Sequence, residues 1–126
     1  MFRMPIVTME RVDSFSAAHR LHSEKLSDAE NKETFGKCNN SNGHGHNYVW
    51  KVKLRGEVDP TSGMVYDLAK LKKEMSLVLD TTTVSTSENV AIYMFEKLKS
   101  VMSNPSVLYK VTIEETPKNI FTYKGC

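Results

Sequence analysis

The chain reads His46-Asn47-Tyr48-Val49-Trp50-Lys51-Val52-Lys53-Leu54-Arg55 at its most regular point. Even-numbered positions from Tyr48 to Leu54 are apolar, whereas most odd-numbered positions are polar or charged. An alternation of period two is typical of a β-strand that buries one face and exposes the other. These residues therefore predict a half-buried strand, and a loop rich in Asn and Gly over residues 38–45 precedes it.

Three further strands are predicted on either side of this one. Residues 6–19 favour a strand because β-branched and aromatic side chains recur, and His19 falls on the same face as Phe15. Residues 109–115 alternate in the same way, and residues 119–123 follow after a proline turn. The sequence thus contains four predicted strands.

Two helices are predicted between the second and third strands. Behind Asp67 as an N-cap, apolar residues recur at helical spacing: Leu68, Leu71, Met75 and Val78. A second set follows a segment with the form of a capping box, Ser85-Thr86-Ser87-Glu88: Val90, Met94, Leu98 and Val101. Asn104-Pro105 ends this helix. The polar residues 21–37 are interpreted as an excursion that holds one short helix.

The order of elements is ββααββ, which predicts an α+β fold with an antiparallel four-stranded sheet and two helices on one face. At 126 residues the chain fits a single domain over residues 1–126. Such a sheet leaves its other face and both edges uncovered, which proteins usually correct by pairing or closure. We therefore expect oligomerisation, in the form of a β-barrel shared between subunits.

Charge and composition exclude several classes of function. The 17 basic and 15 acidic residues are scattered, without the basic stripe of a nucleic-acid-binding protein. No run of eighteen apolar residues and no apolar leader occurs, so we expect a cytoplasmic protein without a membrane partner. The two cysteines, Cys38 and Cys126, make no disulfide framework, and Cys126 is assigned no role.

Three of the four histidines form a candidate metal site. In extended structure His44 and His46 would project to one side, about 6.6 Å apart along the strand. Together with His19 they would give three imidazoles, which suit Zn²⁺ and leave a fourth position for water or substrate. The plain alternative is a pair of loop histidines facing solvent. His22, in the polar excursion, is assigned no role.

Two other residues are candidates for chemistry. Cys38 lies in a polar, Asn-rich loop, where a thiol is more exposed and reactive than in an apolar run, and its thiolate could act as a general base. Glu115 ends the apolar row of Tyr109, Val111 and Ile113. It is either a solvated charge at a strand end or a buried acceptor for two parallel N–H groups.

Several motifs in the same order resemble the 6-pyruvoyl-tetrahydropterin synthases of animal type. The matching segments are Ser14-Phe15-Ser16-Ala17-Ala18-His19-Arg20-Leu21, Phe35-Gly36-Lys37-Cys38-Asn39-Asn40-Ser41-Asn42-Gly43-His44-Gly45-His46-Asn47-Tyr48, Val84-Ser85-Thr86-Ser87-Glu88-Asn89-Val90-Ala91, and the closing Glu115-Thr116 with Tyr123-Lys124-Gly125. The resemblance spans nearly the whole chain, so it is more specific than any single motif.

The resemblance implies the tunnelling fold, in which trimers close a β-barrel and two trimers stack into a hexamer. It implies a lyase that converts 7,8-dihydroneopterin triphosphate to 6-pyruvoyl-tetrahydropterin with elimination of triphosphate, in tetrahydrobiopterin biosynthesis. By the same resemblance, zinc is held by His19, His44 and His46, and Cys38 is the catalytic base. Glu115 would anchor the pterin ring, assisted by Thr86 and Ser87, whereas Glu88 would support the helix start. Lys37 and Arg20 are candidates for the triphosphate by charge and proximity only.

One departure from the family pattern is expected to matter. Between its long helices the family carries a Leu-Asp-His segment and a polar loop, whereas here Leu79-Asp80 runs directly into Thr81 and no histidine follows His46. Either this is a shortened variant, or the sequence as given omits about a dozen residues of a loop. A six-residue connection between antiparallel helices is sterically reasonable, so the length of the connection does not decide between the two. Asp80 is left out of the catalytic set for this reason.

Two other functions stay open at this point. One is a 6-carboxytetrahydropterin synthase-like enzyme, which resembles this chain in its three histidines, although its cysteine typically lies closer to the His-Gly-His motif. The other is a non-catalytic subunit that binds pterin or zinc, which the missing histidine would explain.

Overall fold

The computed structural model describes residues 4–19, 44–79 and 86–125, with side chains omitted at residues 17–19 and 44–46. It contains strands β1 (Ile6–His19), β2 (His44–Glu57), β3 (Leu108–Thr116) and β4 (Asn119–Tyr123). It also contains helices α2 (Leu68–Val78) and α3 (Ser87–Val101) and a short 3₁₀ helix, η2 (Pro105–Val107). The short helix expected within residues 21–37 lies outside the described residues.

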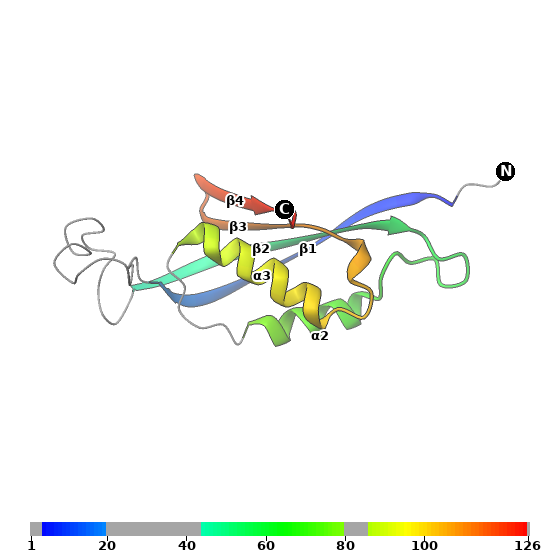
Figure 1. Cartoon of the computed structure of the whole chain (residues 1–126), viewed down its shortest axis with the longest axis horizontal. Coiled ribbons are helices and arrows are strands. Elements are labelled where there is room, and N and C mark those ends of the chain that lie inside the picture. The colour runs from blue at the N-terminus through cyan, green and yellow to red at the C-terminus, as the bar shows by residue number, and fades with distance from the viewer. Residues whose placement is uncertain (1–3, 20–43, 80–85, 126) are drawn as a thin grey trace.

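The four strands form one antiparallel sheet in the order β1-β2-β3-β4, and both helices lie on one face of it (Figure 1). This confirms the α+β fold and the ββααββ order. Helix α3 packs on β3 and β4, and α2 packs on α3. β1 and β4 are the edge strands of this sheet.

The core lies between the sheet and the helices. The alternation in β2 is confirmed, because its apolar row is almost fully buried: Tyr48, Trp50, Val52 and Leu54. Val111 and Ile113 of β3 continue this layer, and the helices add Leu71, Met75, Val78, Val90, Met94 and Leu98. Leu68 is predicted on the same helical face, but its side chain is 56% exposed. Leu68 is the first residue of α2 and lines a surface groove together with Val7 and Met64.

A β-bulge corrects one detail of the sequence interpretation. Lys53 pairs with Lys110, but the next residue of β2, Leu54, pairs with Leu108, so Tyr109 is the extra residue. Leu108 takes the position against the core, and Tyr109 is turned to the surface, where its ring lies near Arg55 and Lys124. Tyr109 is therefore not part of the apolar row.

The helix starts show one confirmed cap and one correction. The Asp67 side chain accepts hydrogen bonds from the backbone N–H groups of Ala69 and Lys70, as predicted. Helix α3, however, is capped by Thr86 and not by Ser85, so Glu88 is not in the position that a capping box on Ser85 requires. The cap lies one residue later than predicted, because the Thr86 hydroxyl accepts a hydrogen bond from the backbone N–H of Asn89 at 3.1 Å.

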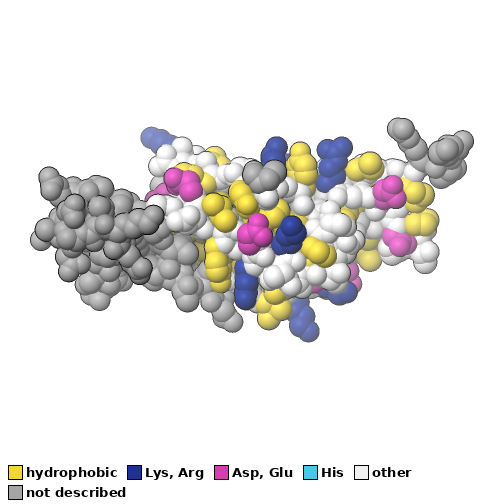
Figure 2. All heavy atoms as spheres, viewed as in Figure 1, with side chains coloured by type: hydrophobic (Ala, Val, Ile, Leu, Met, Phe, Trp, Pro, Cys, Tyr) yellow, Lys and Arg dark blue, Asp and Glu magenta, His cyan; other side chains and the backbone are white. Residues whose placement is uncertain are grey.

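The charged side chains are distributed over the surface. On the face shown in Figure 2, basic, acidic and apolar side chains are interspersed. On the sheet face away from the helices, Lys51 contacts Glu114 at 2.7 Å, and Lys53 contacts Glu10 at 3.6 Å. Within the described ranges, no helix has both the length and the apolar character needed to span a bilayer.

Candidate functional site

The candidate site lies where the start of α3 meets the end of β3. Ser87, the first residue of α3, donates a hydrogen bond from Oγ to Oε2 of Glu115, at 2.7 Å. Ser87 is only 4% exposed, and Glu115 is half-buried. The carboxylate is close to the positive end of the α3 dipole, which attracts negative charge. Glu115 is thus held in place and is not a freely solvated strand end.

The sheet brings Tyr48 to the same place. The last register pair between β2 and β3 is Val49 with Glu114, and Tyr48 and Glu115 are the next residue of each strand beyond this pair. Both continue the core-facing rows of their strands, and Tyr48 is 1% exposed. Burial raises the pKa of the Tyr48 hydroxyl, the nearby Ser87 side chain lowers it in part, and the negative charge of Glu115 raises it further. Tyr48, Ser87 and Glu115 therefore form one linked group, here called the Tyr48 cluster.

Thr86 lies beside this cluster and is the N-cap of helix α3. Its hydroxyl oxygen accepts the Asn89 N–H and so caps α3. A capping hydroxyl still carries a proton that it can donate. The geometry therefore allows the expected contact between the Thr86 hydroxyl and a ligand. The capping hydrogen bond alone is also a sufficient reason for a threonine at this position.

The three expected metal ligands fall on neighbouring strands. His19 of β1 pairs with His44 of β2, and His46 pairs with Ala17 in the same ladder. The backbone thus brings together positions that are 25 residues apart or more in the sequence. Nothing is described of these three side chains, and the described side chains elsewhere contain no group of three His, Cys, Asp or Glu residues able to hold a metal. Cys38, Lys37 and Arg20 lie outside the described residues.

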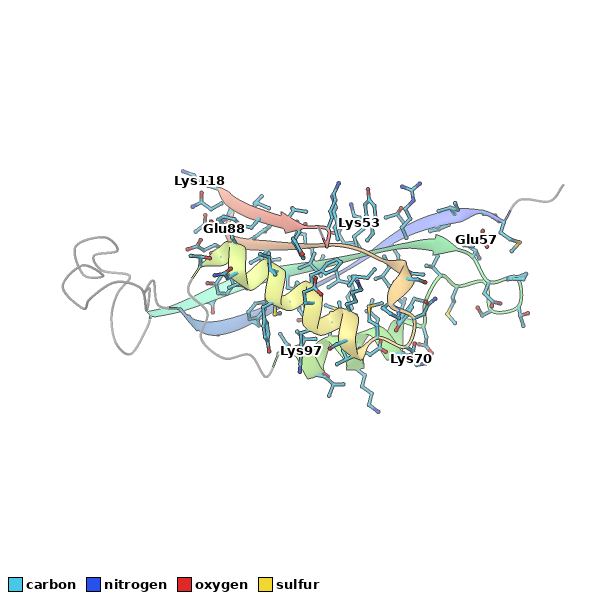
Figure 3. All side chains as sticks on the ribbon, in the orientation of Figure 1. Lys53, Glu57, Lys70, Glu88, Lys97 and Lys118 are labelled. Carbon is cyan, nitrogen blue, oxygen red and sulfur yellow. The ribbon has the colours of Figure 1, made fainter. Side chains whose placement is uncertain are left out.

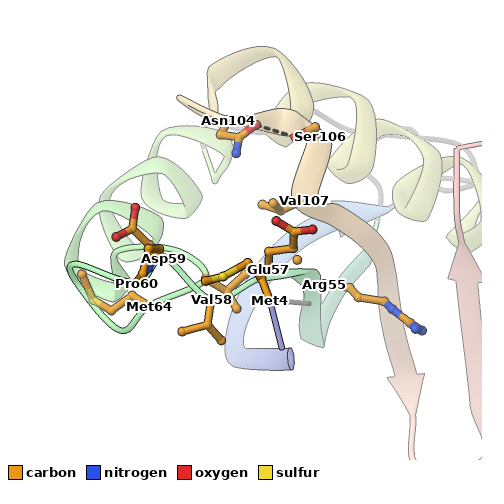
Figure 4. Close-up of a pocket in the computed structure, with 12 residues that line it drawn as sticks. Met4, Arg55, Glu57, Val58, Asp59, Pro60, Met64, Asn104, Ser106 and Val107 are labelled. Atoms are coloured by element: carbon orange, nitrogen blue, oxygen red, sulfur yellow. Dashed lines mark hydrogen bonds between the residues drawn. The ribbon is translucent and has the colours of Figure 1, made fainter. Parts of the chain in front are cut away.

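A surface cavity lies at the opposite end of the sheet. It measures about 570 Å³ and lies between the end of β2, the following loop and η2 (Figure 4); its lining includes Arg55, Glu57, Asp59, Asn104 and Val107. Figure 3 gives the orientation: Glu88 and Lys118 mark the end that holds Ser87 and Glu115, and Glu57 marks the other. Of the expected site residues whose side chains are described, Thr86, Ser87 and Glu115, none lines this cavity.

Comparison with known proteins decides the family. The family model described as 6-pyruvoyl tetrahydropterin synthase matches residues 8–126, almost the whole chain. The chain belongs to the 6-pyruvoyl tetrahydropterin synthase family. Its resemblance to this family, read from the sequence motifs, is thereby confirmed.

Individual members of the 6-pyruvoyl tetrahydropterin synthase family are also similar to the chain. A Caenorhabditis elegans relative is 90% identical over 140 positions, with all of both chains covered. The human 6-pyruvoyl tetrahydrobiopterin synthase is 50% identical over 127 positions, covering 89% of this chain and 87% of the human one. The solved structure of the Caenorhabditis elegans 6-pyruvoyl tetrahydropterin synthase matches with a TM-score of 0.91 and 89% identity, over 100% of each chain.

These relatives are longer than the chain within the matched region. The 140 positions aligned with the Caenorhabditis elegans relative exceed the 126 residues of this chain by 14. Ninety per cent of 140 is 126, so essentially every residue of the chain matches and the difference consists of positions that it lacks. The expectation of about a dozen missing family residues agrees with this difference.

Sequence reasoning missed one member of the Tyr48 cluster. Tyr48 was placed in the apolar row of β2 and given no further part. A signal was present, because Tyr48 has the parity of His44 and His46 and follows them closely on the same strand. The sequence could not show that this row ends near Glu115, since that depends on how β2 and β3 pair.

Proposed function

We propose that the chain catalyses the conversion of 7,8-dihydroneopterin triphosphate to 6-pyruvoyl-tetrahydropterin, with elimination of triphosphate. This is the reaction of a carbon–oxygen lyase that acts on phosphates. Family membership supports it, and so do the animal relatives that carry the name 6-pyruvoyl tetrahydrobiopterin synthase. The single structural observation that carries the proposal is the Ser87–Glu115 hydrogen bond at 2.7 Å.

The oriented carboxylate of Glu115 suits a pterin ring. The amino-pyrimidine edge of a pterin presents two parallel N–H groups, which match the two oxygens of a carboxylate. Each carboxylate oxygen has two lone pairs, so Oε2 can accept from Ser87 and also from a ligand. Burial of Ser87 removes competing water on that side. In this proposal Glu115 binds the ring, and Ser87 and Thr86 assist it.

The register of β1 and β2 supports a zinc site on His19, His44 and His46. Residues directly opposite one another on antiparallel strands have Cβ atoms about 4.5–5.5 Å apart, a spacing that allows two side chains to share an ion. His19 and His44 are such a pair, and His46 is two positions along. A zinc ion with three imidazole ligands polarises substrate oxygens and acidifies neighbouring C–H bonds when bound. The imidazoles must be neutral to bind it.

Cys38 is the proposed catalytic base. A cysteine thiol ordinarily has a pKa near 8.5, and a positive charge nearby lowers this value, so a cysteine in such surroundings can supply a thiolate base near neutral pH. In the proposal it removes a proton from the side chain of the substrate. The rearrangement is an internal redox step, which needs no external hydride donor.

The open edges of the sheet support an oligomer. β1 and β4 each present unpaired backbone groups along one side, and pairing β1 of one subunit with β4 of the next would satisfy both. Repeated around a threefold axis, this pairing closes a barrel, and two such trimers would make the expected homohexamer. The scarcity of cysteine suits the reducing cytoplasm, where we propose that the enzyme acts.

A second candidate is a non-catalytic subunit that binds pterin or zinc. The observation in its favour is the set of 14 positions that the Caenorhabditis elegans relative has and this chain lacks. If these include the family's Asp-His segment, a partner of Cys38 in proton transfer is lost, while the Tyr48 cluster is retained. Binding would then survive without turnover.

One assay separates the candidates. The full chain, loaded with zinc, is incubated with 7,8-dihydroneopterin triphosphate, and both released triphosphate and the pterin product are measured. Triphosphate together with 6-pyruvoyl-tetrahydropterin supports the proposal, whereas release of acetaldehyde indicates the 6-carboxytetrahydropterin synthase reaction. Tight pterin binding without triphosphate release indicates the non-catalytic subunit. Cys38→Ala is the matched control, since it should retain zinc and pterin and lose turnover.

A further inference from the structure

We propose that Thr116 is a positioning residue for pterin recognition: its hydroxyl holds the turn between β3 and β4, and this turn fixes the β-bulge that carries Glu115. The proposal rests on the function proposed above and adds to it a residue outside the expected site. Thr116 would act through Glu115 and would not itself touch the ligand.

The first step of the argument is a β-bulge at Glu115. Glu114 of β3 pairs with Ile120 of β4. Thr116 pairs with Asn119, which directly precedes Ile120. Glu115 is therefore the extra residue on β3, and a bulge changes the direction of the side chain that it carries. The direction of the Glu115 side chain thus depends on where the bulge lies.

The second step is the reason why β3 needs this extra residue. Ile113 pairs with Phe121, and both side chains pack in the core. The chain turns back over the two residues between Thr116 and Asn119. Without an extra residue, a turn closed at this point would set Phe121 opposite Glu114 and rotate its ring away from the core. The bulge reconciles the register of the turn with that of the core, so the closure of the turn sets its position.

The third step is the part that Thr116 plays in the turn. Its Oγ1 accepts the backbone N–H of Lys118 at 3.2 Å and that of Asn119 at 3.1 Å. Neither Pro117 nor Lys118 has a positive φ, which excludes the type I′ and II′ turns that best match the twist of paired strands. Because the turn lacks this match, it depends on side-chain support, which the Thr116 hydroxyl supplies.

The fourth step joins the turn to the carboxylate. The Ser87 hydroxyl donates to Oε2 of Glu115 at 2.7 Å and so holds the outer end of the side chain. The bulge holds the other end, at the Glu115 backbone. Two parallel N–H groups of a pterin ring need both carboxylate oxygens in one plane. The Thr116 hydroxyl therefore helps to fix the orientation on which both contacts depend.

The test measures binding of neopterin, a non-reactive pterin without phosphate, to the full zinc-loaded chain. Thr116→Val keeps the shape of the exposed side chain and removes the hydroxyl that holds the turn. A carboxylate that keeps only one of its two ring contacts predicts affinity about three- to tenfold weaker, with zinc content unchanged. Thr116→Ser, which keeps a hydroxyl, should restore most of the affinity.

A double variant distinguishes positioning from an independent contact. If Thr116 acts only through Glu115, Thr116→Val added to Glu115→Ala causes no further loss beyond about twofold. Losses that multiply, or a Thr116→Val protein that binds as the wild type does, overturn the inference while the proposed function stands. Failure of the wild type to bind neopterin at all overturns the proposed function, and the inference with it.

Two control variants separate positioning from a general loss of stability. Thr112→Val makes the same substitution on β3, where the Thr112 hydroxyl lies 3.2 Å from that of Thr122 on β4. Asp59→Ala removes a side chain that accepts two backbone N–H groups in its own loop, at the other end of the sheet. Both should leave neopterin affinity unchanged. If either control lost as much affinity as Thr116→Val, the inference would be wrong.

Discussion

Tyr66 donates a 2.5 Å hydrogen bond to Oε1 of Glu74, and each of the two residues is only 7% exposed. The second carboxylate oxygen, Oε2, accepts the backbone N–H of Ser103 at 2.9 Å. One buried carboxylate therefore joins three segments: the loop before α2, the helix itself and the chain that leaves α3. Charged groups inside proteins are stable only when they are paired in this way.

Glu74→Ala is predicted to lower the free energy of unfolding by about 2–3 kcal/mol, because two donors lose a charged acceptor in a buried place. Chemical denaturation of the two proteins measures this directly. Glu88→Ala, which removes an exposed carboxylate from α3, is the control and should change stability far less. A Glu74→Ala protein as stable as the Glu88→Ala one would contradict the prediction.

Tyr66 predicts a specific loss of stability in alkali. Burial and the hydrogen bond to Glu74 raise the pKa of its hydroxyl above the ordinary value of 10.0, while bonds from Ser103 partly oppose them. The unfolded chain loses this proton near pH 10 and the folded chain at higher pH, so stability is full below pH 10 and falls as the pH rises toward the folded pKa. Unfolding free energies of wild type and Tyr66→Phe, measured from pH 8 to 11, should differ in slope above pH 10. If the unfolding free energies of the two proteins changed with pH in parallel above pH 10, the prediction would be wrong.

Thr86 offers a way to separate capping from binding. Thr86→Ala should cost about 0.5–2 kcal/mol of stability through loss of the N-cap, whereas Thr86→Asn keeps a good cap. If Thr86 also donates to the pterin, both variants bind neopterin more weakly; if it only caps α3, Thr86→Asn binds normally. Thermal melting and neopterin titration of the same samples provide the two readouts. We expect weaker binding in both.

Glu115→Gln should weaken neopterin binding at least tenfold. The amide keeps the size of the side chain but replaces one acceptor oxygen with a donor, so one contact to the ring becomes repulsive. Glu114→Gln is a control one residue away, because Glu114 faces the other side of the sheet and contacts Lys51 at 2.7 Å. Zinc content should be normal in both. Equal affinities of wild type and Glu115→Gln would show that Glu115 does not bind the pterin ring and that its carboxylate only accepts the hydrogen bond from Ser87.

Zinc is predicted at one ion per subunit, bound by His19, His44 and His46. Because each of three protein ligands is needed in such a site, Ala at His44 or at His46 should abolish metal binding. His22→Ala replaces the remaining histidine of the chain and should keep the metal. Elemental analysis of the purified variants decides the matter. Unchanged zinc in both the His44→Ala and His46→Ala proteins would show that the metal, if any, is held elsewhere.

Local pattern was sufficient for most secondary structure. The alternation in β2, the helical spacing of Leu71, Met75 and Val78, and the Asp67 cap all appear in the structure as predicted. Each depends on residues within a few positions of one another, where periodicity and hydrogen-bonding capacity act directly. Even so, the cap of α3 was placed one residue early, since Ser85 and Thr86 are equally suitable side chains and only the helix geometry selects Thr86.

The sequence by itself determined the family, the order of the elements, and the residue types available for chemistry. Tertiary structure alone decided which of these meet. The pairing of β1 with β2 sets His19 opposite His44, and the packing of α3 on β3 brings Ser87 to Glu115. A bulge displaced Tyr109 from the core row that its parity predicted. Register joins residues far apart in the chain, and a shift of one position turns a side chain to the other face, so local periodicity cannot fix it.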